Sequence, residues 1–271
     1  MRFLKIIGKS FIDFFRDEGL MLAGSMSYFT MMALIPFCLF MLTLLGYLLG
    51  QYPEFYRFFS GKLAGLFPAV TEDVTREILK LISNKGLGKV SLFLYGFLSY
   101  QVFASFEHSL NVIFKVTKKR NIVASVLLSL AMVTLLLGLI MASFAAASAV
   151  PLINVAKPYL PAVKIGKMTG FILRFVLPFV LMLFAATVLY KMLPKARVKF
   201  PDAFKGAFFT TLFLEVAKYV FTLYVVKVMH LGKIYGSLSA FIVFLLWMFY
   251  SSSIFLIGAE IVHNLGRPRK H

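Results

Sequence analysis

Long apolar segments dominate this sequence and restrict what it can fold into. One of them, YGSLSAFIVFLLWMFYSSSIFLIGAEIVHN (Tyr235–Asn264), reaches its first formal charge only at Glu260. A helix of about 20 apolar residues crosses the hydrocarbon core of a bilayer, whereas an exposed apolar run of this length would make a soluble protein aggregate. The segment is therefore predicted to be a transmembrane helix.

The whole chain repeats this pattern. Segments of this kind occur at 22–50, 89–113, 122–150, 168–193, 203–228 and 234–262. Only 15% of the 271 residues are charged, against about a quarter in soluble domains. Because lipid cannot satisfy backbone N–H and C=O groups, each segment must be helical. The expected fold class is an all-α polytopic membrane protein with six transmembrane helices, forming one membrane domain over 1–271.

The N-terminal segment 1–20 is predicted to be an amphipathic helix lying in the membrane interface. Charged residues interrupt it too often for a signal peptide. Instead, apolar residues share one helical face and charged residues the other. The apolar face comprises Leu4, Ile7, Phe11, Phe14 and Phe15. The charged face comprises Lys5, Lys9, Asp13 and Arg16.

The basic residues predict the orientation. Lys and Arg are densest in the N-terminal tail, around 115–120 and 191–199, and in the C-terminal tail. These segments should therefore be cytoplasmic, with both termini inside. The long loop 51–88 is then external, and TEDVTREILKLISNKG within it predicts a helix. Anionic headgroups account for the net charge of +18 without nucleic acid, so membrane lipids are the expected partners.

Ionisable side chains inside the spans are the candidates for function, since each costs about 2.5 to 3.5 kcal/mol at the centre of a membrane helix. The segment 203–228 carries a stripe at helical spacing, formed by Thr211, Glu215, Lys218 and Thr222. The stripe is either a Glu215–Lys218 pair packed against other helices or a wall that faces a substrate. Both interpretations keep this face away from lipid.

Other candidates lie near the ends of spans. Glu107 and Glu260 are expected near the inner mouth of a cavity, and Arg174 nearer its outer part, one turn before Pro178. Pro178, like Pro36 in the first span, should kink its helix. The full set of predicted substrate-binding or coupling residues is Glu107, His108, Arg174, Thr211, Glu215, Lys218 and Glu260. The three serines at 251–253 are expected to bond to backbone carbonyls one turn earlier or to permit close helix contact.

Catalytic interpretations find little support. Glu260 and His263 form one Glu-x-x-His motif, but a dinuclear carboxylate site needs two such motifs and further carboxylates. The only cysteine, Cys38, lies in an apolar span and is expected to be a packing residue. No metalloprotease, hydrolase or nucleotide-binding motif occurs. The chain is expected to be no enzyme and to bind no metal or cofactor.

Four stretches together resemble the YihY/BrkB family of bacterial inner-membrane proteins. They are LAGSMSYFTMMALIPF (Leu22–Phe37), FEHSLNVIFKV (Phe106–Val116), YKMLPKARVKFPDAFKGA (Tyr190–Ala207) and YGSLSAFIVFLLWMFYSSSIFLIGAEI (Tyr235–Ile261). Around Glu107 and His108 the chain departs from the family's usual pattern. The resemblance implies the inner membrane as the location and, for some relatives, lipid handling in the envelope. The family's older label, ribonuclease BN-like, is rejected because the short cytoplasmic segments cannot build a carboxylate metal cluster in a groove.

The leading hypothesis is a transporter or flippase-like handler of an amphipathic, anionic envelope substrate such as a lipid. Arg174 and Lys218 would attract its headgroup, while Glu107, Glu215 and Glu260 would be counter-ions or proton-coupling groups. One alternative is a structural subunit with a protein partner in the cell envelope. Another is a small-solute or ion transporter.

Overall fold

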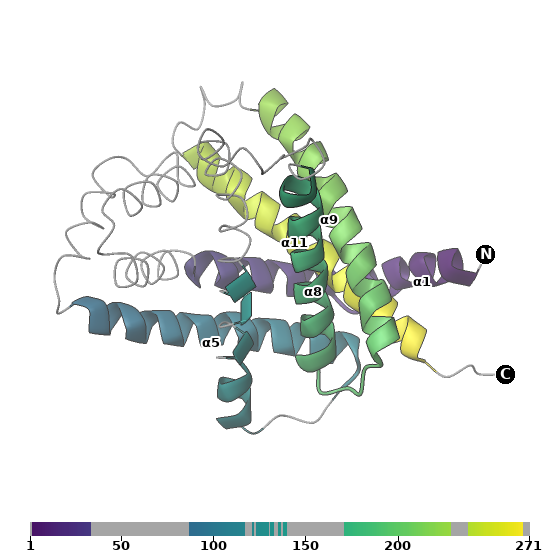
Figure 1. Cartoon of the computed structure of the whole chain (residues 1–271), viewed down its shortest axis with the longest axis horizontal. Helices are drawn as coiled ribbons and strands as arrows, with labels where there is room; N and C mark the ends of the chain where they lie inside the picture. The colour runs from purple at the N-terminus through teal and green to yellow at the C-terminus, as the bar shows by residue number, and fades with distance from the viewer. Residues whose placement is uncertain are drawn as a thin grey trace, which may run out of the picture. The chain divides into compact units, whose positions relative to one another are not determined.

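The computed structural model describes residues 2–33, 87–116, 171–228 and 238–267, together with parts of 121–139. All regular secondary structure in these ranges is helical (Figure 1). The fold therefore confirms the all-α prediction for the described part of the chain. Nearly all of the predicted external helix and loop at 51–88, and Pro36 in the first span, lie outside the described residues.

Where the structure describes a predicted span, the helix agrees with it to within a few residues, but most of the spans predicted at 22–50 and 122–150 lies outside the described residues. They are α1 (Arg2–Arg16), a helix over 19–33, α5 (Leu87–Ile113), the π-helical turn η1 (Ile172–Val176), α8 (Leu177–Met192), α9 (Phe200–Val228) and α11 (Leu238–Gly266). Among the described residues, Phe200–Tyr224 and Ile242–Gly266 are long and apolar enough to cross a membrane. The segment Leu177–Met192 is a shorter apolar helix.

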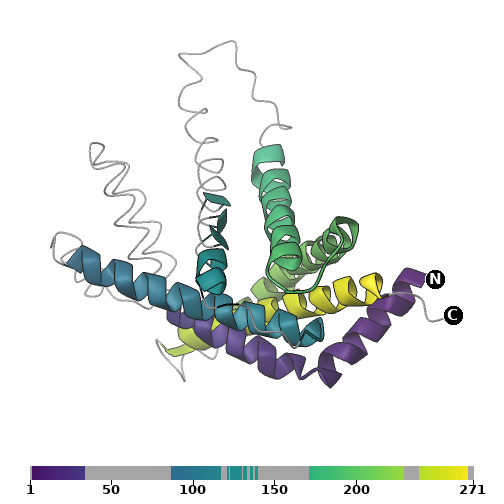
Figure 2. The ribbon, with the colours of Figure 1, turned by 90° about the horizontal axis from the view of Figure 1, so that it is seen from below.

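The N-terminal helix is shorter than expected. The prediction placed one helix over 1–20, but α1 ends at Arg16, and a separate helix begins at Gly19 (Figure 2). Glu18 causes the break because its φ of 57° is in the left-handed region, which a right-handed helix cannot include.

Pro178 distorts its helix, as predicted. The turn just before it, η1, is π-helical, and the N–H of Leu177 bonds to the carbonyl oxygen of Ile172, five residues earlier. A proline has no N–H to donate, and its ring crowds the carbonyl group four residues before it. Widening this turn relieves the crowding, and the regular helix α8 resumes with Pro178 in its first turn.

The described chain forms two compact units, which α5, α9 and α11 each pass through. The first consists of Met1–Glu18, Leu110–Val216 and Ile254–His271, and the second of Gly19–Ser109 and Ala217–Ser253. In the second unit, the Ser27 hydroxyl donates to Ser252 Oγ at 3.3 Å, and Ser253 donates to the carbonyl oxygen of Phe249 at 2.9 Å. The predicted bond to a backbone carbonyl one turn earlier is thereby confirmed for Ser253, and Ser252 contacts the helix over 19–33.

The core of the first unit depends on two glycines where α9 and α11 meet. A Cβ atom at Gly206 would overlap Val262 and the carbonyl oxygen of Gly258. One at Gly258 would overlap the hydroxyl groups of Thr210 and Tyr190. Small residues let helix backbones approach closely, which is how helices associate in membranes. The two helices can therefore pack at this distance only because both positions lack a side chain.

Candidate functional site

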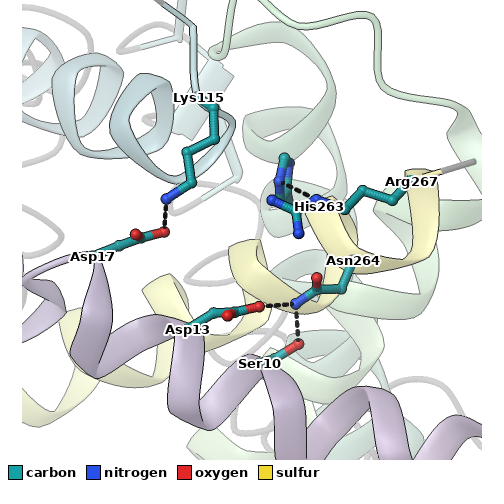
Figure 3. Close-up of polar contacts among 7 residues, drawn as sticks. All are labelled: Ser10, Asp13, Asp17, Lys115, His263, Asn264 and Arg267. Atoms are coloured by element: carbon teal, nitrogen blue, oxygen red, sulfur yellow. Dashed lines mark hydrogen bonds and ion pairs between the residues drawn. The ribbon is translucent and has the colours of Figure 1, made fainter. Parts of the chain in front are cut away.

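A polar face of α1 packs against the C-terminal turns of α11 in the first unit (Figure 3). The Asn264 side chain donates hydrogen bonds to Ser10 Oγ and Asp13 Oδ2, both at 3.0 Å. Ser10 is completely buried, and Phe14 beside it is 2% exposed. Asp13, which the sequence places on the charged face of this helix, accepts a hydrogen bond from the neighbouring helix.

The other two faces of α1 are exposed. Phe11, Ile12 and Phe15 present apolar surface, with Ile12 70% exposed. Lys5, Lys9 and Arg16 form an exposed basic side. An amphipathic helix at a membrane surface combines these two faces, so the docked polar face is an addition to the pattern predicted for α1. The spacing of Ser10, Asp13 and Asp17, three and then four residues, was the sequence signal for this third face.

Lys115 completes the contact from the end of α5. That helix ends in a Schellman motif, in which Val116 N–H bonds to Asn111 O and Lys115 N–H to Val112 O. Lys115 occupies the left-handed position of this motif, with a φ of 57°, where glycine is preferred. Its ammonium group forms an ion pair with Asp17, the residue that follows α1. The backbone strain at this position would be smaller with glycine, but glycine could not form the ion pair.

Glu260 lies beneath this contact and is 1% exposed. Neither of its carboxylate oxygens has a hydrogen-bond donor among the described residues. The carboxyl group of Asp17 lies within hydrogen-bonding reach of it, and the charges of Asp13 and Lys115 are also close. Two carboxyl groups can bond to each other only when one of them holds a proton. The two carboxyl groups therefore repel each other unless one of them holds a proton.

The last turn of α11 lines a cavity of about 240 Å³. The Nε–H of Arg267 donates to His263 Nε2 at 3.0 Å, so this imidazole is neutral, with its proton on Nδ1. The His263 ring also packs edge-on against Phe114, with 5.5 Å between ring centroids. The other charged residues on the cavity wall come from the connection between α8 and α9 and from the first turn of α9, and they are Arg197, Lys199 and Asp202.

The remaining predicted site residues lie in α5, η1 and α9. In α5, Glu107 is buried whereas His108 is exposed. In α9, Thr211 is buried, with its hydroxyl lacking a partner among the described residues, while Glu215 is half-buried and Lys218 exposed.

Three of these residues have an interaction partner, and one is described only by its backbone. Glu107, Glu215 and Lys218 each have an interaction partner. Arg174 lies in η1, and its side chain is outside the described part of the structure. Within the described ranges, no group of three or more His, Cys, Asp or Glu residues is arranged to hold a metal ion.

A buried hydroxyl network was missed by the sequence analysis. Tyr190 is completely buried, and its hydroxyl donates to the carbonyl oxygen of Phe255 at 2.6 Å. Its oxygen lies 2.7 Å from Thr210 Oγ1, so Thr210 must be the donor in that second bond, because a tyrosine has only one hydroxyl proton. Tyr190, the first residue of the YKMLP stretch, is thus hydrogen-bonded to α11 in the turn before Gly258.

Residues 11–270 match the family model described as virulence factor BrkB. The chain belongs to the BrkB family. Among its relatives, a UPF0761 membrane protein of Rhodospirillum centenum is 33% identical over 93% of this chain and 55% of its own length. One of Kangiella koreensis is 29% identical over 98% of this chain and 64% of its own length, and one of Aliivibrio salmonicida is 31% identical over 90% and 77%.

The BrkB-family chain is thus a membrane protein, as its relatives' names state. It spans little more than half the length of the relative from Rhodospirillum centenum. No solved structure matches the chain. Its contacts connect three of the family-like stretches. Tyr190 bonds to Phe255 of the last stretch, and Lys195 N–H, in the same stretch as Tyr190, bonds to Asn111 Oδ1 of the Phe106–Val116 stretch at 3.0 Å.

Proposed function

We propose that this BrkB-family protein moves or accommodates an amphipathic, anionic lipid of the cell envelope and catalyses no reaction. It would do so as a six-helix protein of the bacterial inner membrane, with both termini in the cytoplasm. The six apolar segments of the sequence and the distribution of Lys and Arg support this topology.

The buried carboxyl group of Glu260 carries the proposal. An ionisable side chain in a membrane helix is costly, and it usually marks a substrate path or a proton relay. Glu260 has no donor to either oxygen among the described residues, yet it faces Asp17, which is paired with Lys115. A proton gained or lost here would change the charge under α1. Proton exchange could thereby be coupled to movement of a substrate.

The helix α1 supports a lipid as the substrate. Its exposed apolar side chains, Phe11, Ile12 and Phe15, suit insertion among acyl chains, and its basic side suits anionic headgroups. The docked face of the same helix contacts α11 through Asn264, one turn after Glu260. The helix proposed to contact the membrane surface is therefore hydrogen-bonded to the helix that carries the proposed proton site.

The test compares Glu260→Gln with Glu18→Gln, a matched control at an exposed carboxylate. Lipids that co-purify with each protein are identified by mass spectrometry and compared with the bulk membrane. Movement of fluorescent phosphatidylglycerol across proteoliposomes is then measured with and without a pH gradient. We expect an anionic lipid to be enriched in the wild-type protein and in both variants. We expect lipid movement to be at least tenfold slower than wild type in Glu260→Gln and unchanged in Glu18→Gln.

Two results would reject the proposal. If the wild-type protein neither enriches nor moves a lipid, a structural subunit of an envelope complex becomes the better interpretation. If it moves lipid but Glu260→Gln does so at the wild-type rate, Glu260 has no coupling role. Thermal unfolding of each variant in detergent checks that the substitution has not disturbed the fold.

A further inference from the structure

The cavity at the end of α11 has the chemistry of an anion site. Its wall carries three permanently cationic side chains, Arg197, Lys199 and Arg267, against one carboxylate, Asp202. His263 adds no charge because its Nε2 accepts a hydrogen bond from Arg267. The cavity therefore has an excess of positive charge.

The two cations of the connection between α8 and α9 remain available to a ligand. Among the described residues, neither Arg197 nor Lys199 forms an ion pair. Asp202 lies in the first turn of α9, where the positive end of the helix dipole offsets its charge. Both Arg197 and Lys199 are exposed, so their charged groups are free to turn toward a ligand.

Arg267 is oriented for binding. Its Nε–H is held by His263, which leaves the N–H groups of both terminal nitrogens to donate to a ligand. A planar guanidinium with parallel N–H groups matches two oxygens of a phosphate, and this geometry is the reason that arginine is favoured at phosphate sites. A phosphate group is thus a better fit to the cavity than a simple halide ion.

The rest of the wall suits the apolar part of a lipid headgroup region. Phe114 and Val262 line the cavity and are 9% and 1% exposed. Its volume of about 240 Å³ lies below the ~300–1,000 Å³ of pockets for drug-sized ligands, so it fits a headgroup rather than a whole lipid. Val262, His263 and Gly266 also form the end of the apolar segment Ile242–Gly266, the level at which headgroups lie.

We propose that this cavity binds a phosphate group, carried by an anionic phospholipid at the membrane surface or by a soluble phosphate compound. Arg197, Lys199 and Arg267 would hold the phosphate oxygens, while Phe114 and Val262 contact the carbon atoms next to them. The proposed site does not include Glu260, and it needs no transport of the bound molecule.

The experiment measures binding to the whole chain in dodecyl maltoside micelles, which contain no phosphate. One arm titrates short-chain phosphatidylglycerol, and a second titrates inorganic phosphate, each followed by calorimetry at low and high salt. The variants are Arg197→Gln with Lys199→Gln, as a double substitution, and Asp202→Asn. Lys195→Gln is the matched control, because it removes a cation from the same connection outside the cavity wall.

We expect the double variant to bind at least tenfold more weakly and Asp202→Asn to bind more tightly, with the control unchanged. Tighter binding by Asp202→Asn cannot arise from a damaged fold, so this variant keeps the test decisive. A preference for phosphatidylglycerol over inorganic phosphate would assign the site to lipid, and equal affinity would assign it to a soluble phosphate. Wild-type affinity in the double variant, or no saturable binding in either arm, would overturn the proposal. Neither result bears on the movement assay with Glu260→Gln.

Discussion

The hydroxyl group of Tyr190 donates a hydrogen bond to the carbonyl oxygen of Phe255 at 2.6 Å, and the two aromatic rings stack with centroids 4.7 Å apart. One residue therefore binds both the backbone and the side chain of another helix. Thr210 of α9 donates to the same tyrosine oxygen, so three helices meet at a single completely buried atom. This junction sets the packing of α8, α9 and α11 in the first unit.

Removal of the Tyr190 hydroxyl should destabilise the protein by about 1–3 kcal/mol, because it leaves buried groups without their partners. Thr210→Val should cost about 1 kcal/mol, the value of one net hydrogen bond. The effects of Tyr190→Phe and Thr210→Val should not add, since they remove one shared bond. Unfolding of the four proteins of this double-mutant cycle in mixed detergent micelles measures the coupling. Strict additivity would show that the Thr210 bond contributes nothing.

Gly258→Ala should destabilise the protein by about 1–3 kcal/mol, the usual cost of overpacking. Its methyl group would overlap the hydroxyl groups of Thr210 and Tyr190. Gly24→Ala is the control, because nothing lies within 4 Å of its added Cβ atom, and it should be neutral or stabilising. Thermal unfolding of the two variants in the same detergent compares them. Equal unfolding temperatures would contradict the close approach of α9 and α11.

Lys115→Gly should destabilise the protein less than Lys115→Ala does. Both substitutions remove the ion pair with Asp17, which is worth about 0.2–1 kcal/mol for a pair whose lysine is 47% exposed. Only glycine also relieves the left-handed backbone, a gain of about 1–2 kcal/mol over alanine. Unfolding free energies in mixed micelles give the difference. A lysine-to-glycine change that costs more than the alanine change would refute this account of the α5 terminus.

Asn264→Ala should release α1 from the end of α11. The substitution removes both hydrogen bonds that Asn264 donates, to Ser10 and Asp13, and leaves these groups unpaired. Amide hydrogen exchange followed by mass spectrometry should then rise about tenfold in peptides covering 5–16, as expected for a loss of about 1.4 kcal/mol of local stability. Lys9→Ala, on the exposed side of α1, is the control and should leave the exchange unchanged. Unaltered exchange in Asn264→Ala would mean that other contacts hold the helix.

The candidate site could be predicted only in part. Glu260 was identified because a carboxylate in a long apolar segment is costly wherever it points. Its neighbours could not be identified, because Asn264 is 254 residues from Ser10 and 251 from Asp13 in the sequence. No local pattern relates residues so far apart. The docked face of α1 is visible in the sequence as a spacing of polar residues, but only the contact with α11 shows that this face is buried.

The sequence by itself determined the class of protein and several local features. Long apolar segments such as those of α9 and α11 require helices, because lipid offers no hydrogen bonds to the backbone. Pro178 had to distort its helix because it lacks an N–H, and the serines near 252 had to find oxygen partners. Each of these follows from interactions within a few residues or between the chain and its solvent.

Only the tertiary structure decided which faces meet. The apolar helices α8, α9 and α11 have no distinct polar and apolar sides, so hydrophobicity does not set their rotation. Contact between such helices depends on the fit of small and large side chains and on a few buried hydrogen bonds. That fit determines three contacts: Gly258 packs against Thr210, Tyr190 stacks on Phe255, and Glu260 faces Asp17. They exist only once the helices have packed.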